Sequence, residues 1–147
     1  MPQSIEMEIL INAPPSAVWE VLTNPARMET WMGEPEMDLK IETGWKEGSP
    51  ITIEGFHHVK FTNSGTVLQF EKEKALKYDF LSSVSRLQDT PENHTLIGFT
   101  LIPENGGTLL KLELSNFPTE AIRKHNEFYW KATLELLKRT VEHPYIF

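Results

Sequence analysis

The segment from Thr119 to Glu142 constrains the fold of this 147-residue chain more than any other. Charged side chains of alternating sign recur along it three and four positions apart, which is typical of the wet side of a long helix. Thr119 is a suitable N-cap, and Pro144 follows the expected end. We therefore expect one long amphipathic helix whose other side covers an apolar layer. The charged residues are Lys124, Glu127, Lys131, Glu135, Lys138 and Glu142.

The opposite side of this helix mixes apolar and polar side chains. Asn126, Tyr129 and Thr133 fall at i, i+3 and i+7, with His125 at their edge. A dry core does not hold several neighbouring polar groups unless each is hydrogen-bonded. They indicate either a small-molecule cavity or bonds to one another or to trapped water. The same side carries Ile122, Leu136, Leu137 and Thr140, flanked by Trp130 and Leu134.

The first part of the chain predicts a strand and two short helices. Ile5, Met7, Ile9 and Ile11 share one face, with Glu6 and Glu8 on the other, which is the period of a half-buried strand. Pro14-Pro15-Ser16 then opens a helix, since proline is tolerated in a first helical turn. Asn24-Pro25 ends that helix, and Ala26 to Trp31 predicts a second one.

From Glu36 to Leu114 the pattern predicts strands joined by short turns. Thr62-Asn63-Ser64-Gly65 and Glu104-Asn105-Gly106-Gly107 have the composition of hairpin turns. Successive strands joined in this way form an antiparallel meander. The sequence thus predicts an α+β fold with a curved antiparallel sheet of about seven strands. The expected strands here are Asp38–Glu42, one around Ile51 to Gly55, His58–Phe61, Thr66–Glu71, one carrying Leu76, Tyr78 and Phe80, His94–Ile102 and Thr108–Leu114.

The composition limits the classes of partner. The net charge of -7 argues against a nucleic-acid surface, which needs clustered Lys and Arg. The chain has no Cys, so thiolate metal sites and cysteine nucleophiles are excluded. Its N-terminus lacks the basic and apolar regions of a signal peptide, and no stretch has the apolar length of a membrane span. We expect a cytoplasmic protein.

Three stretches carry a resemblance to a known family. They resemble the START-like or SRPBCC superfamily, the helix-grip fold of the birch pollen allergen (Bet v 1-like). Within it they are most similar to the bacterial homologues of the heat-shock protein 90 ATPase activator (AHSA-like). The stretches are Ala13 to Pro25 with Met28 and Trp31, Gly65 to Glu71 with Leu76 to Phe80, and Gly107 to Leu112 with Trp130, Leu134, Leu137 and Lys138.

The resemblance spans nearly the whole chain, so it implies a single domain over residues 1–147. It also implies the helix-grip fold, in which two short helices follow the first strand and a long C-terminal helix packs on the sheet. The superfamily hosts lipid transporters, cyclases, hydrolases and co-chaperone modules, so the fold leaves function open. One departure bears on any cavity. Tyr129 stands where the family usually has glycine, and its ring should reshape the space beneath it.

No convincing catalytic or metal-binding set is present. His57 and His58 are expected on opposite faces of one strand, where they could not share a metal. The other histidines lack HExxH or similar spacing, and no phosphate-binding loop is found. Glu34, Glu36 and Asp38 are interpreted as a solvated acidic rim. We therefore expect no catalytic residues, no metal and no cofactor, and favour a protein that is not an enzyme.

Aromatic residues are spread over elements that this fold arranges around one interior, where each could equally fill the core. We predict a ligand pocket between the sheet and the long helix, with Trp31 and Trp45 as lids near the short helices. Its occupant would be an apolar or amphipathic small molecule. A chaperone-binding module is the alternative, and a cyclase or hydrolase rests on superfamily analogy only. The expected pocket residues are Trp31, Trp45, Phe70, Tyr78, Phe80, Phe99, His125, Asn126, Tyr129 and Thr133.

Overall fold

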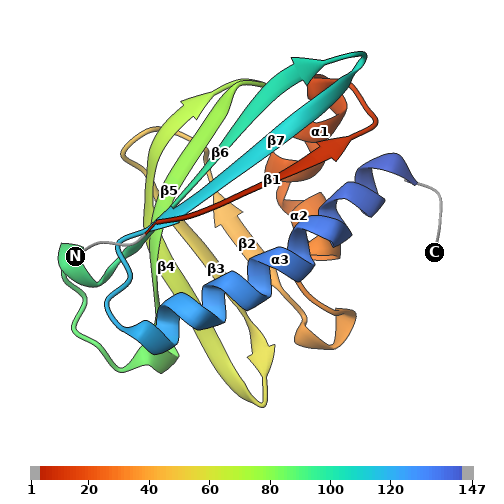
Figure 1. Ribbon diagram of the computed structural model, residues 1–147. Helices are drawn as coiled ribbons and strands as arrows, with labels where there is room; N and C mark the ends of the chain where they lie inside the picture. Colours follow the sequence, from red (N-terminus) through yellow and green to blue (C-terminus); the bar gives the residue numbers. More distant parts are fainter. Residues whose placement is uncertain (1–3, 144–147) are drawn as a thin grey trace.

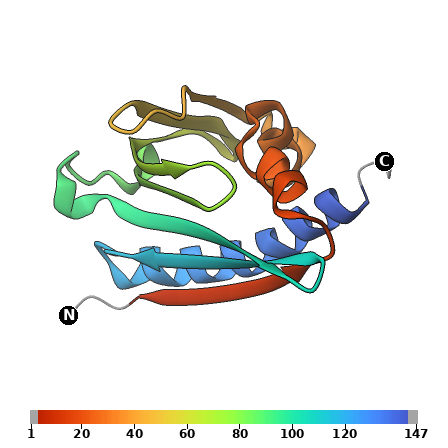
Figure 2. The same ribbon diagram turned by 90° about the horizontal axis from the view of Figure 1, so that it is seen from above.

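A computed structural model describes residues 4–143 of the chain. One seven-stranded antiparallel sheet, in the order β1-β7-β6-β5-β4-β3-β2, curves along a long helix, α3 (Figure 1). Two short helices, α1 and α2, lie at one end of the sheet beside the C-terminal half of α3 (Figures 1 and 2). The predicted α+β helix-grip fold is confirmed. The strands are β1 (Ile5–Ile11), β2 (Lys40–Thr43), β3 (Pro50–His57), β4 (Val59–Glu71), β5 (Ala75–Ser82), β6 (Thr95–Glu104) and β7 (Gly107–Ser115).

Local sequence signals explain where the helices begin and end. Helices α1 (Pro15–Thr23) and α2 (Pro25–Trp31) each have proline in the first turn, where a missing N–H costs no hydrogen bond. The Asn24 side chain caps α2 by accepting from the backbone N–H of Ala26 at 3.0 Å. Helix α3 (Glu120–Glu142) starts at Thr119, whose Oγ1 accepts from the N–H of Ile122 at 3.1 Å. The predicted cap and the predicted helix end are both confirmed.

One predicted turn is wrong. Residues 62–65 lie inside β4, and the reversal between β3 and β4 falls at His58, whose φ is 66°. Gly65 is needed for close strand packing, because a Cβ there would lie 1.7 Å from the carbonyl oxygen of Asp79. The predicted Asn105-Gly106 turn is confirmed, with φ of 48° and 82° at its two residues.

The start of β2 also differs from the prediction. β2 begins at Lys40, because Asp38 adopts a left-handed conformation (φ 47°) at the end of a 3-10 turn, η1 (Pro35–Met37). Two further 3-10 turns, η2 (Ser83–Ser85) and η3 (Pro91–Asn93), occupy the connection between β5 and β6.

The core lies between the sheet, α1, α2 and the inner side of α3. Trp130, Leu134 and Leu137 are buried at the centre of the inner side, with Trp130 only 3 % exposed. Leu136, which we expected on that side, is 39 % exposed. Compared with the prediction, the buried side of α3 is therefore rotated toward Trp130 and Leu134. The apolar side chains of these two residues fill the space beneath the sheet. No helix in the described residues has the length and apolar character needed to cross a membrane, and a cytoplasmic location stays a prediction.

Candidate functional site

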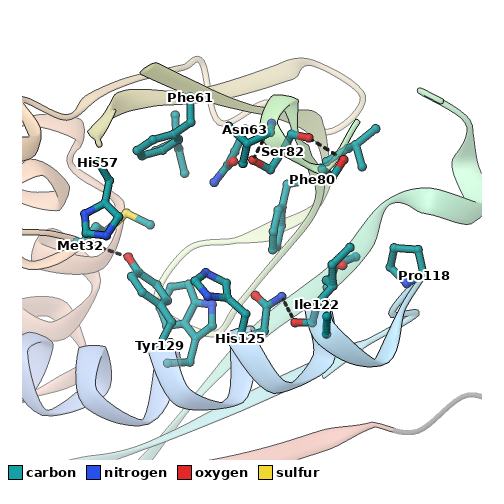
Figure 3. A pocket seen from close by; sticks show the side chains of 18 of the residues that line it. Met32, His57, Phe61, Asn63, Phe80, Ser82, Pro118, Ile122, His125 and Tyr129 are labelled. Atoms are coloured by element: carbon teal, nitrogen blue, oxygen red, sulfur yellow. Dashed lines mark hydrogen bonds between the residues drawn. The ribbon is translucent and has the colours of Figure 1, made fainter. Parts of the chain in front are cut away.

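A cavity of about 480 Å³ lies between the N-terminal half of α3 and strands β3, β4 and β5. Figure 3 shows side chains pointing into it from the helix on one side and from the strands on the other. Segments around η1, η2 and η3 complete its walls. The lining residues are Met32, Met37, Leu39, Ile53, His57, Val59, Phe61, Asn63, Tyr78, Phe80, Leu81, Ser82, Val84, Ser85, Asn93, Thr95, Pro118, Ala121, Ile122, His125, Asn126, Tyr129 and Trp130.

The cavity wall contains no Asp, Glu, Lys or Arg, although the whole chain carries a net charge of -7. The histidines in the wall are His57 and His125. His57 ends β3 and His125 lies on α3, and both are exposed to solvent. Their rings point toward the same space (Figure 3). An ionised ligand group would therefore find no oppositely charged Lys, Arg or carboxylate in the interior to compensate for its desolvation.

Two tyrosines, the buried Tyr78 and the half-buried Tyr129, line the end of the cavity near α2. The hydroxyl of Tyr129 donates a hydrogen bond to the carbonyl oxygen of Met32 and so ties α3 to the end of α2 (Figure 3). Burial raises the pKa of Tyr129 to about 12. Burial, with a smaller contribution from Tyr129, also raises the pKa of Tyr78 well above its usual value. Both phenols are therefore protonated donors at neutral pH.

Tyr78 differs from Tyr129 in having a free hydroxyl. The side chain is only 3 % exposed, yet its hydroxyl makes no hydrogen bond to any described residue. No fully enclosed side-chain nitrogen or oxygen in residues 4–143 lacks a partner. The Tyr78 hydroxyl must therefore reach the open space of the cavity, where it can donate to a bound molecule.

Two amides add polar groups to the apolar wall. Asn126 is buried on α3, and its Nδ2 donates to the carbonyl oxygen of Ile122 at 2.9 Å, which leaves the amide oxygen as an acceptor. Asn63 points into the cavity from β4 (Figure 3). A mainly apolar space with a few placed polar groups is the usual character of a small-molecule site.

Of the ten side chains expected in the pocket, five line the cavity and five do not. Phe99 and Thr133 are buried in the core beyond the cavity wall. Phe70 and Trp45 lie at the other end of the sheet, where their rings stack with centroids 5.5 Å apart. The fifth residue outside the cavity is Trp31. Those that line the cavity are Tyr78, Phe80, His125, Asn126 and Tyr129.

The expected tryptophan lids are wrong. Trp31 is 1 % exposed, and its Nε1 donates to the carbonyl oxygen of Val21 at 2.9 Å. The Nε1 of Trp45 donates to the carbonyl oxygen of Thr23 at 2.5 Å. Trp31 is buried and Trp45 half-buried, so both indoles act as donors that fix the two short helices, and neither lines the cavity.

Several lining residues were not predicted. Ile53 and Phe61 belong to strands whose alternation was visible in the sequence, but alternation alone does not show which face is inside. Asn63 was missed because it was assigned to a turn. The wall formed by Val84, Ser85 and Asn93 comes from irregular segments, for which the sequence holds no periodic signal.

The expected opposite directions of His57 and His58 are also wrong. Because the hairpin turns at His58, the two imidazoles lie together, with ring centroids 4.6 Å apart. Within residues 4–143 no group of three or more His, Asp or Glu side chains is arranged to hold a metal ion. Two adjacent histidines alone provide fewer ligands than a structural zinc site needs.

A third histidine holds the loop between β5 and β6. In His94, Nδ1 lies 3.2 Å from an oxygen of Asp79, and Nε2 lies 2.5 Å from an oxygen of Asp89. Partial burial lowers the pKa of His94, but the hydrogen bonds and charges of Asp89 and Asp79 outweigh it, and the net pKa is raised. Since both nitrogens face carboxylates, the protonated ring, which has two donors, fits this arrangement best.

Fold and cavity together define a helix-grip protein, and comparison with known proteins narrows the class. The family model described as Activator of Hsp90 ATPase homolog 1-like protein matches residues 12–142, so the chain belongs to this family. No curated protein matches the chain. Membership in this family supports, in general terms, a role as a ligand-binding or co-chaperone-like module.

Solved structures agree with this assignment. The chain is similar to ChR145 of Cytophaga hutchinsonii, with 32 % identity, a TM-score of 0.79, and coverage of 97 % of this chain and 95 % of the other. CV1439 of Chromobacterium violaceum shares the fold at 20 % identity, a TM-score of 0.80 and coverage of 95 % and 97 %. So does a protein described as the Aha1 dimer of Colwellia psychrerythraea, at 21 % identity, a TM-score of 0.76 and coverage of 98 % and 99 %.

Proposed function

We propose that this protein binds an uncharged, largely apolar small molecule in the cavity between α3 and strands β3 to β5. The observation that carries the proposal is the free Tyr78 hydroxyl, buried in a cavity of about 480 Å³ whose wall has no Asp, Glu, Lys or Arg. Burying a hydroxyl without a partner is unfavourable unless water or a ligand accepts its hydrogen. A ligand with a carbonyl or ether oxygen at one end would supply that acceptor.

The size and walls of the cavity narrow the ligand further. A volume of about 480 Å³ falls in the usual range for sites that enclose drug-sized molecules. Phe61, Phe80 and Trp130 supply aromatic surface, which favours a ligand with rings or flat apolar segments. The protein would hold or carry this molecule, since the cavity wall contains no Asp or Glu to form a carboxylate acid–base pair.

Binding of an uncharged apolar dye tests the proposal directly. We expect Nile red, which carries a carbonyl oxygen, to bind to the wild type with an increase in fluorescence. Asn63→Trp should abolish binding, because the indole would fill the space into which the amide points. Thr100→Trp is the matched control, since Thr100 is an exposed β6 residue outside this cavity. Absence of dye binding by the folded wild type, or equal binding by both variants, would rule out the cavity as the site.

Native mass spectrometry of protein purified from its own host adds an independent test. A retained small molecule that is lost in Asn63→Trp would identify the physiological ligand class. An anionic dye such as ANS should bind more weakly than Nile red to the wild type, because the cavity holds no Lys or Arg. A clear preference for the anionic dye would contradict the uncharged ligand.

The family description favours a second candidate function, in which the chain acts on a chaperone of the Hsp90 type. The measurement is ATP hydrolysis by the Hsp90-type chaperone of the same organism, with and without added protein. A rise in the hydrolysis rate that persists in Asn63→Trp would support a co-chaperone role that does not depend on the cavity. An unchanged rate would remove this candidate.

A further inference from the structure

Helix α3 carries an unpartnered apolar stripe on the side turned away from the core. Phe128, Ala132 and Leu136 are spaced by one helical turn each, so they lie in a row. Phe128 is 80 % exposed, the highest value among the large apolar side chains of the described residues, and Leu136 is 39 % exposed. The buried residues Trp130 and Leu134 face the opposite direction. Nothing in the described part of the chain covers Phe128, although isolated exposure of so large a ring costs free energy.

A row of charges of alternating sign runs along one edge of this stripe. Lys124, Lys131 and Lys138 alternate along the helix with Glu127, Glu135 and Glu142. When a second copy of α3 packs antiparallel against such a row, residues near the N-terminal end of one helix face residues near the C-terminal end of the other helix. A charge pattern that is complementary to its own reverse thus identifies a second copy of the same helix as its partner.

The pattern of α3 meets that condition. We propose that a second copy of this chain docks on the stripe of Phe128, Ala132 and Leu136, with the two α3 helices antiparallel and a twofold axis at Ala132. Phe128 then faces the partner's Leu136, and each Ala132 faces its own copy. Small side chains at the axis allow the helices to approach closely, which lets the flanking large side chains pack.

The charged edges pair in the same register. In an antiparallel helix pair, a charged residue at the edge does not meet the partner residue that its position would face across the stripe. It meets the partner residue two positions further along the chain. Lys131 is therefore next to the partner's Glu135, and the twofold axis makes this pair occur twice. Glu142 takes no part, because its carboxylate already accepts from Lys138 and from the N–H of Asn12, each at 2.7 Å.

The size of the contact sets the expected affinity. A helix of 23 residues is roughly 35 Å long, and a contact limited to one helix per subunit lies at the small end of specific interfaces. We expect association in the micromolar range, weakened by salt, because the ion pairs are exposed. Sedimentation velocity over a concentration series should show a monomer–dimer equilibrium at low salt.

Charge reversal tests the register. Lys131→Glu gives a helix with Glu at both 131 and 135, and Glu135→Lys gives one with Lys at both. Each variant alone should lose self-association by tenfold or more, since one attraction becomes a repulsion on both sides of the axis. Mixed in equal amounts, the two variants should form a heterodimer, because every cross-pair is again opposite in sign. Loss of helix stability cannot produce this recovery on mixing, and a mixture that stays monomeric would overturn the proposed register.

Cysteine cross-linking tests the axis, since the chain has no cysteine of its own. At an interaxial distance of 8–10 Å, the two Ala132 Cα atoms would be roughly 4–5 Å apart, within disulfide range. Ala132→Cys should form a covalent dimer under mild oxidation. Ala121→Cys is the matched control on the same side of α3, and its two copies would lie about 33 Å apart. Equal cross-linking of both variants would place the axis elsewhere.

Phe128→Glu completes the test by placing a charge opposite the partner's Leu136, at one end of the stripe. The variant should sediment as a monomer at concentrations where the wild type is half dimeric. A dimer that persists in this variant would show that another surface is used and would overturn the proposal. A wild type that stays monomeric at millimolar concentration would overturn it as well, and would leave the stripe to a partner of different sequence.

Discussion

Trp130 of α3 lies edge-on against Phe99 of β6, with ring centroids 5.7 Å apart and an interplanar angle of 71°. On its other side the indole meets Trp31 of α2 at 6.2 Å. One side chain thus joins the long helix to both the sheet and the short helices. The same contacts close off the C-terminal half of α3, so that the cavity is confined to its N-terminal half.

Trp130→Ala should lower the free energy of unfolding by about 3–5 kcal/mol, as expected for truncation of a buried aromatic side chain. The control is Phe128→Ala, two positions away on the same helix but 80 % exposed, which should change it by less than about 0.5 kcal/mol. Chemical denaturation of monomeric protein in high salt would measure both. Similar losses in the two variants would contradict the observed orientation of α3.

The orientation of α3 shows what the sequence could and could not predict. The charged row fixed the helix bounds and the exposed side, because charges are rarely buried. The polar residues Asn126, Tyr129 and Thr133 correctly indicated the inner side, but the structure shows Thr133 beyond the cavity. Its position depends on how Trp130 and Phe99 fill the adjacent core, and side-chain packing between distant elements is not encoded in local periodicity.

The β3–β4 hairpin shows the same limit for turns. Asn63 and Gly65 are favourable turn residues, yet both belong to β4, and the chain reverses at His58. Tertiary contacts decided this, since Gly65 lies against the backbone of Asp79 and the adjacent N–H of Thr66 donates to the Asp79 carboxylate at 2.9 Å. Because the turn was predicted at the wrong residues, Asn63 was not expected in the pocket, and His57 and His58 were expected to point in opposite directions.

Gly65→Ala should therefore destabilise the protein by about 1–3 kcal/mol or more, because its Cβ would lie 1.7 Å from the Asp79 carbonyl oxygen. Gly44→Ala is the control, since a Cβ at Gly44 would meet no heavy atom within 4 Å. Thermal and chemical denaturation of the two variants provide the comparison. A wild-type melting temperature for Gly65→Ala would show that β4 and β5 are farther apart than described.

Removing the two tyrosine hydroxyls should separate ligand binding from stability. Tyr78→Phe should leave the free energy of unfolding nearly unchanged, because the hydroxyl has no bond to the described residues, and weaken Nile red binding about twofold to tenfold. Tyr129→Phe loses the bond to the Met32 carbonyl and should cost about 1 kcal/mol of stability. If Tyr78→Phe lost stability and Tyr129→Phe did not, the structural hydrogen bond would belong to Tyr78 and not to Tyr129.

The His94 arrangement predicts a pH dependence of stability. Because the folded-state pKa of His94 is raised above its ordinary 6.5, the protonated ring stabilises the fold. The sign follows directly: this stabilisation is complete below pH 6.5 and is lost as the pH rises through the folded-state pKa. The free energy of unfolding should therefore decrease with increasing pH above 6.5, and the loop that carries Asp89 should loosen over the same interval.

His94→Gln is the variant for this test, since its amide can still bond one carboxylate but cannot become charged. The difference in unfolding free energy between wild type and His94→Gln should be largest at pH 6 and should shrink as the pH is raised. A histidine NMR titration gives the folded-state pKa in the wild type directly. A wild-type pKa at or below the ordinary value, or a difference that grows with pH, would show that Asp79 and Asp89 do not hold the charged ring. The cavity wall at Ser85 and Asn93 belongs to the same connection between β5 and β6, so Nile red affinity should fall over the same pH interval in the wild type only.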